Sequence, residues 1–232
     1  MYIMLCFFIL FLGYLIIGIS FYLLKKREVL KEIKLDYLPL IVMLILCGLI
    51  FLVRMLTPYL SPALSLWISI PEKLKNVDKA AAIHCSFDYL FLVVLVLIGW
   101  IDYKQQIIPN ILNGLILVLG LFKLISDMVV AETIGFTEHI IGLLVLSVPL
   151  VIISIFYKGS FGMGDVKLLA SAGFFMGWKD LVMGTFLGSF IAAIICIVSL
   201  LRHKMGLKDK IAFGPYLCIG IGIMTVAGWI SY

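Results

Sequence analysis

Two aspartates stand out because each lies at the end of an apolar stretch that is otherwise almost free of charge. Asp102 lies in Gly-Trp-Ile-Asp-Tyr-Lys, and Asp165 lies in Phe-Gly-Met-Gly-Asp-Val-Lys. If their side chains meet, like charge and loss of water raise the pKa of one carboxyl while the other stays ionised. The ionised group can take a proton from a water, and the protonated group can polarise a carbonyl and protonate a leaving nitrogen. Such a pair titrates as a unit, so neither residue alone is assigned as the acid or the base.

Two glycines and a lysine flank Asp165. Gly162 and Gly164 lack a Cβ atom, which would let an extended substrate backbone approach closely and let the chain bend into a helix. Lys167 would lower the pKa of Asp165 or attract an acidic substrate residue. Structural interpretations fit the same residues: a tight turn before a helix for the glycines, an interfacial lysine, and a helix N-cap for Asp165.

The composition places these residues in a membrane protein. Of 232 residues, 64% are hydrophobic and 13% are charged, whereas a soluble domain has about 45–50% apolar and about 25% charged residues. The core of a chain this size cannot hide so much apolar surface, which excludes a water-soluble monomer. The net charge of +5 is then typical of basic cytoplasmic loops rather than of nucleic-acid binding.

Eight apolar stretches predict an all-α, polytopic membrane protein. They lie near Tyr2–Leu24, Leu38–Leu56, Ile83–Ile101, Ile107–Val130, Glu138–Tyr157, Asp165–Trp178, Leu181–Leu201 and Ile211–Ile230. The sixth stretch would form about 21 Å of helix, which is short for the hydrocarbon core. We expect one membrane-embedded unit over residues 1–232. Its N-terminal part, 1–82, would hold two helices and, over 57–82, an external loop with room for one amphipathic helix; 83–232 would hold the core with both aspartates.

The basic residues predict the orientation. Twelve of the 18 Lys and Arg residues fall in segments that are cytoplasmic if both chain termini lie outside, as the positive-inside rule favours. The first apolar run has no basic residue before it, while Lys25, Lys26 and Arg27 follow it. This order predicts a retained helix rather than a cleaved signal peptide. On this topology Asp102 and Asp165 lie at matched depth, at the cytoplasmic ends of their helices, which favours the catalytic interpretation.

The other ionisable and nucleophilic residues predict no second site. Asp88 lies about 21 Å from Asp102 along one helix, towards the outer face, where we expect an interfacial or packing role. Asp127 lies near the outer end of the fourth crossing. Neither a metal site nor a nucleophilic triad nor a disulfide framework is indicated by the scattered histidines, serines and cysteines.

Three blocks of sequence resemble the type IV prepilin peptidase family, the Gly-x-Gly-Asp membrane aspartyl proteases. The blocks are Ile101-Asp102 with Ile108-Pro109-Asn110, Gly162-Met163-Gly164-Asp165-Val166-Lys167, and Phe213-Gly214-Pro215-Tyr216. The resemblance covers roughly residues 85–230 and implies that Asp102 and Asp165 are the catalytic pair. The supporting residues that it implies are Gly162, Gly164, Lys167, Pro109, Asn110, Phe213, Gly214 and Pro215. It further implies cleavage of the basic leader of type IV prepilins or pseudopilins, typically after a glycine, at the cytoplasmic face of the bacterial inner membrane.

One segment departs from the family pattern. Many bacterial members carry two zinc-binding cysteine pairs between the first two crossings, in a segment associated with N-methylation of the new amino terminus. Here only residues 25–37 separate these crossings, and they contain no cysteine. The resemblance therefore implies peptidase activity without a metal or cofactor. S-adenosylmethionine would be needed only if methylation were retained, which the sequence does not support.

Two alternatives stay open at the level of the sequence. One is an intramembrane protease of the signal-peptide-peptidase kind, although the Pro-Ala-Leu block of those enzymes occurs here only at Pro62-Ala63-Leu64, too early in the chain. The other is a proton-coupled transporter that uses the acidic pair. The expected partners are the lipid bilayer and a pilin-like substrate, with no nucleic acid, and the sequence does not indicate an oligomeric state.

Overall fold

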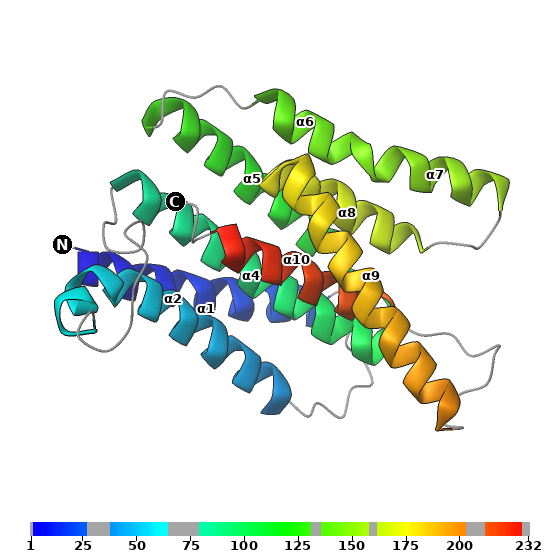
Figure 1. The fold of residues 1–232 in the computed structure, drawn as a ribbon, viewed down its shortest axis with the longest axis horizontal. Helices are drawn as coiled ribbons and strands as arrows, with labels where there is room; N and C mark the ends of the chain where they lie inside the picture. The colour runs from blue at the N-terminus through cyan, green and yellow to red at the C-terminus, as the bar shows by residue number, and fades with distance from the viewer. Residues whose placement is uncertain are drawn as a thin grey trace.

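The computed structural model describes residues 2–26, 38–64, 79–130, 136–157, 162–202 and 212–228. Within these ranges the chain folds into helices and forms no strand, which confirms the all-α prediction (Figure 1). The helices are α1 (Tyr2–Lys26), α2 (Leu38–Leu64), α4 (Lys79–Gln105), α5 (Asn110–Val130), α6 (Phe136–Val145), α7 (Ser147–Phe156), α8 (Met163–Met176), α9 (Trp178–Leu201) and α10 (Gly214–Gly228).

Several helices are long and apolar enough to cross a bilayer, so the chain is a multi-pass membrane protein. The candidate spans among the described residues are Pro39–Leu56, Ala82–Gln105, Asn110–Val129, Phe136–Phe156 and Trp178–Leu201, with shorter apolar helices at Ile9–Ser20 and Gly214–Gly228. The predicted sixth crossing corresponds to α8, which has 14 residues and lies outside these spans. Most of the basic loop residues lie outside the described ranges, so the orientation in the membrane stays a prediction.

Two predicted boundaries differ from the structure at prolines. The candidate span ends at Leu56 as predicted, but helix α2 continues beyond it, through Pro58 and Pro62 to Leu64, so the first part of the expected external segment is helical. A proline removes one backbone hydrogen bond, but its φ near −65° is itself helical. The predicted fifth crossing is divided at Leu146 into α6 and α7, because Pro149 offers no N–H to the carbonyl one turn earlier. Residues 65–78, which belong to the segment expected to form an external loop after α2, lie outside the described residues.

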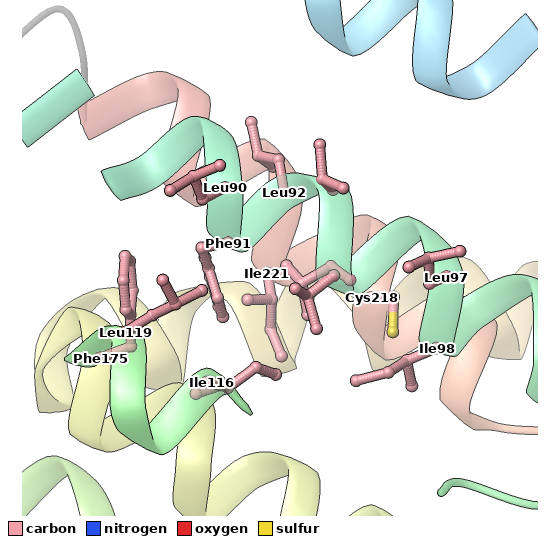
Figure 2. Close-up of a cluster of buried hydrophobic side chains, with 14 of the residues drawn as sticks. Leu90, Phe91, Leu92, Leu97, Ile98, Ile116, Leu119, Phe175, Cys218 and Ile221 are labelled. Carbon is pink, nitrogen blue, oxygen red and sulfur yellow. The ribbon is translucent and has the colours of Figure 1, made fainter. Parts of the chain in front are cut away.

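Helix α4 forms the centre of the bundle. Within Ala82–Gln105, 72% of the residues are buried, against 17% in the span of α9. Helices α1, α2, α5 and α10 pack directly on α4, while α6 and α7 run along the opposite side of the bundle from α1 and α2 (Figure 1). Figure 2 shows the buried cluster at the centre, to which α4, α5, α8 and α10 each contribute, among them Phe91, Ile116, Phe175 and Ile221.

Paired glycines allow the helices around this centre to approach closely. A Cβ atom at Gly142 of α6 would overlap the carbonyl of Gly173 in α8, and one at Gly220 of α10 would overlap the carbonyl of Gly184 in α9. Small residues at such crossings let helix backbones pack against each other in a bilayer, where no hydrophobic driving force brings helices together. The short helix α8 is thereby held against α6 as well as α5.

Candidate active site

Asp102 lies in the last turn of α4 and is only 5% exposed. The helix ends three residues later because Gln106 adopts a left-handed conformation, with φ 54°. Its backbone N–H donates a 2.8 Å hydrogen bond to the carbonyl of Asp102, which closes the helix in the manner of an αL cap. A residue other than glycine in this conformation costs roughly 1–2 kcal/mol. The chain therefore turns sharply just after Asp102, before α5 begins at Asn110.

The Asp102 carboxylate lies against the first residue of α10. The backbone N–H of Gly214 is hydrogen-bonded to this carboxylate, and a Cβ atom at position 214 would be 2.6 Å from its Oδ2 atom. Any side chain there would displace the carboxylate. Pro215 follows in the first helical turn, where its missing N–H removes no helical bond. The carbonyl of Phe213 accepts hydrogen bonds from the N–H groups of Tyr216 and Leu217, at 3.2 and 3.3 Å.

Asp165 lies in the first turn of α8 and not at its N-cap, so the N-cap interpretation is wrong. The N-cap position is occupied by Gly162, whose backbone is extended and whose carbonyl accepts the N–H of Val166 at 3.3 Å. The Asp165 side chain folds back over this residue, because a Cβ atom at Gly162 would be 3.1 Å from its Oδ2. Burial, and to a smaller extent the nearby carboxylate of Asp102, together raise the pKa of Asp165 to about 6.

The side chain of Ile108 connects the two aspartate-bearing regions. A Cβ atom at Gly164 would be 3.1 Å from the Ile108 Cβ, and one at Gly214 would be 3.3 Å from the Ile108 Cδ1. The end of α4, the start of α8 and the start of α10 therefore converge on the short turn between α4 and α5. The structure thus brings Asp102 and Asp165, from two different helices, to one place.

The structure pairs Lys167 with Asn110, while its two predicted roles, towards Asp165 and towards an acidic substrate residue, stay predictions. Its Nζ atom donates a 3.0 Å hydrogen bond to Oδ1 of Asn110, at the start of α5, in an exposed position. The pKa of Asp165 is raised by burial and by Asp102, and side chains two residues apart on a helix point in different directions. Pro109, which is buried, precedes this pair, and its carbonyl accepts the N–H of Leu112 at 3.1 Å. Lys167 and Asn110 thus join the starts of α8 and α5.

The described part of the chain contains no group of three His, Cys, Asp or Glu side chains that could hold a metal ion. The histidines there make other contacts. His84 lies 3.2 Å from Asp127, and the Nδ1 atom of His139 lies 2.6 Å from the carbonyl oxygen of Phe174. Two carboxyl groups placed as Asp102 and Asp165 are suited to activating a water for attack on a carbonyl.

A second buried polar group lies near the other end of α4 and includes a residue that the sequence did not predict. Asp88 is buried and accepts a 2.7 Å hydrogen bond from Nζ of Lys123 in α5. Asp88 is thus packed inside the bundle, where its carboxylate is paired with the charged side chain of Lys123. Lys123 could have been found as a single charge within the apolar run Gly-Leu-Phe-Lys-Leu-Ile, since ionisable residues inside membrane helices are costly and usually have a role.

The part of the chain that holds both aspartates is similar to known proteins. The profile of the type IV leader peptidase family matches residues 89–197, which include both aspartates. The protein named prepilin leader peptidase/N-methyltransferase in Escherichia coli K12 is 32% identical over 171 residues, covering 66% of this chain and 73% of that protein. No solved structure matches the chain significantly.

Two further relatives that are also named prepilin leader peptidase/N-methyltransferase come from other bacteria. The Aeromonas hydrophila protein is 30% identical over 152 residues, and the Pseudomonas aeruginosa PAO1 protein is 31% identical over 144 residues. These matches cover 60% and 59% of this chain but only 46% and 45% of the relatives. The chain thus matches less than half the length of these two relatives.

Proposed function

Because the chain belongs to the type IV leader peptidase family, we propose that it is an aspartic endopeptidase that removes the basic leader of type IV prepilins or pseudopilins. The observation that carries the proposal is the convergence of Asp102 and Asp165. One carboxylate lies against the backbone of Gly214, and the other has a pKa raised to about 6 by burial and by its partner. Neither of the two alternatives, transport and intramembrane cleavage of the signal-peptide-peptidase kind, is favoured by a separate observation.

The pair would hydrolyse a peptide bond with a single shared proton. The ionised carboxylate takes a proton from a water, and the water oxygen bonds to the scissile carbonyl carbon. At the same time the protonated carboxyl gives its proton to the carbonyl oxygen. The tetrahedral intermediate then collapses as its C–N bond breaks. The carboxyl that took the water proton gives it to the leaving nitrogen, while the other carboxylate takes a proton from a hydroxyl of the intermediate as the new carboxyl group forms, which restores the single shared proton. No metal or cofactor is needed for these steps.

The surroundings of Asp165 support an extended substrate. Gly162 and Met163 are exposed at the start of α8, and Gly162 presents bare backbone beside the Asp165 carboxylate. A substrate strand can therefore approach the pair more closely than a side chain at 162 would allow. The exposed Lys167–Asn110 pair would form one edge of the substrate site, next to the catalytic pair.

We place the site at the cytoplasmic face of the bacterial inner membrane. The support is the excess of Lys and Arg in segments on one side of the predicted topology. The relatives carry N-methyltransferase in their names, but residues 25–37 of this chain hold no cysteine pair. We therefore propose proteolysis without methylation, and hence without S-adenosylmethionine.

The test is co-expression with an epitope-tagged prepilin, followed by mass spectrometry of the new amino terminus. The wild-type chain should remove the leader after a glycine and leave the terminus unmethylated. D102N and D165N should each abolish cleavage while remaining in the membrane fraction. E138Q removes an exposed carboxylate that pairs with Lys179 at 3.3 Å and should cleave normally. Full cleavage by D165N would overturn the proposed mechanism, and an N-methylated product would overturn the absence of methylation.

A further inference from the structure

A buried ion pair joins α4 to α5 inside the apolar part of the bundle. Lys123 Nζ lies 2.7 Å from Oδ1 of Asp88, and the two side chains are only 7% and 4% exposed. Both residues belong to candidate membrane spans, where an ionised side chain is costly and is usually retained for a specific role. Replacing such a pair by apolar residues is often neutral or stabilising, so stability alone does not explain it.

Lys123 also contacts the helix that carries Asp165. Its Nζ atom lies 4.5 Å from the ring centroid of Phe175 in α8, a cation–π distance. The Phe175 ring in turn stacks on Phe91 of α4, with centroids 4.2 Å apart and planes 17° apart. Figure 2 shows Phe91 and Phe175 facing each other across the core. We call these four residues, Asp88, Phe91, Lys123 and Phe175, the Lys123 clamp.

The Lys123 clamp connects the two helices that carry Asp102 and Asp165, at a point distant from these aspartates. Along α4, Asp88 and Asp102 are separated by about 21 Å, and along α8, Phe175 and Asp165 by about 15 Å. Helices of this length are stiff, so an angle set at the clamp determines a position at the other end. A change of about 5° between α4 and α8 would move Asp165 by about 1.3 Å, and a misplacement of about 1 Å can cost about 100-fold in rate.

We propose that Lys123 is a positioning residue for the aspartate pair: its simultaneous contacts with Asp88 and Phe175 set the angle between α4 and α8. The inference rests on the proposed function only for its effect on catalysis, since the contacts stand independently of it. A directional ionic contact specifies one arrangement of the helices, whereas apolar packing alone tolerates several. A small polar cavity, about 30 Å³ in volume, adjoins the clamp.

Asp180 of α9 lines the same cavity as Lys123 and Asp88 and lies within electrostatic reach of the lysine. If Asp88 is replaced, Lys123 still has the carboxylate of Asp180 nearby. If Lys123 is replaced, both Asp88 and Asp180 lose the cation that they share. The lysine is for this reason the residue to change first.

The first measurement is the kinetics of leader cleavage by K123M. We expect kcat to fall about tenfold or more, because the two aspartates are displaced relative to each other. KM should change less, because Gly162 and Lys167 move together with Asp165 at the start of α8. K179M removes an exposed lysine from the pair with Glu138 and should keep the wild-type kcat. A K123M enzyme with wild-type kcat would overturn the proposal.

The second measurement reports the helix angle without using activity. Spin labels are attached at Y103C and M163C, two exposed positions at the ends of α4 and α8, in a background without the five native cysteines. Pulsed electron resonance then gives the distance distribution between the labels. We expect a single narrow distribution with Lys123 present and a shifted or broadened one in K123M.

A double variant keeps the test informative if K123M does not fold. D88L/K123M removes both charges of the buried pair together and should remain inserted, because it leaves neither Asp88 nor Lys123 as a lone buried charge. We expect it still to show a reduced kcat and a broadened distance distribution. A double variant with wild-type kcat and an unchanged distribution would overturn the positioning role. If the wild-type chain cleaves no prepilin, the proposed function fails, and the distance distributions alone decide the role of the clamp.

Discussion

The carboxylate of Asp102 lies against the backbone of Gly214, so closely that a Cβ atom at position 214 would be 2.6 Å from Oδ2. These residues belong to α4 and α10, and the Gly214 N–H is hydrogen-bonded to the carboxylate. The start of α10 therefore sets where this acidic group can lie.

G214A should reduce kcat by about 100-fold, since it displaces the carboxylate and weakens a backbone hydrogen bond of the kind that active sites depend on. Cleavage of a tagged prepilin by purified protein checks this. G114A is the matched control, because a Cβ atom at Gly114 meets nothing within 4 Å and alanine favours the helix by about 0.5–1 kcal/mol. Equal activity of the two variants would contradict the importance of this contact.

The activity should fall as the pH rises above about 6. The pKa of Asp165 is raised to about 6, so the pair holds its shared proton below this pH and loses it above. The protonated fraction, and with it kcat/KM, should fall about tenfold per pH unit on the alkaline side. The profile of kcat/KM between pH 5 and 9 measures this. A flat profile across that range would be incompatible with a protonated carboxyl in the mechanism.

Lys167 and Asn110 should act as one unit. K167M and N110A should each lower kcat/KM about threefold to tenfold, because each breaks the same exposed hydrogen bond, worth about 0.5–1.5 kcal/mol. In a double-mutant cycle the K167M/N110A enzyme should be no worse than either single variant. The alkaline limb of the pH profile should not move in K167M. A shifted limb would mean that Lys167 acts on Asp165 after all.

Q106G should stabilise the protein. Gln106 adopts a left-handed conformation with φ 54°, which glycine accepts without the steric cost that other residues meet. The expected gain is about 1 kcal/mol, measured as a higher midpoint of thermal unfolding in detergent. Q106A removes the same side chain but keeps the backbone strain, so it should show no such gain. A lower midpoint for Q106G would show that the side chain contributes more than the backbone costs.

Some features of the fold and site could be predicted from local sequence. Asp102 and Asp165 can be identified as candidates from the sequence, because each is a carboxylate at the end of an apolar stretch that contains few other charged residues. The role of Lys167 was not predictable in this way, since it depends on the direction of a side chain relative to α5. The continuation of α2 to Leu64 is not predictable from local sequence, because Pro58 removes one backbone hydrogen bond without breaking the helix.

Composition and the placement of rare charges are local properties, so the sequence alone predicts a membrane protein of helical class and indicates Asp102 and Asp165 as candidate catalytic residues. The contact of Gly214 with Asp102, and the contacts of Lys123 with Asp88 and Phe175, become visible only in the folded chain. These contacts connect helices that are far apart in sequence. They depend on how closely glycines let those helices approach and on which faces meet, and neither property is encoded in the periodicity of any single segment.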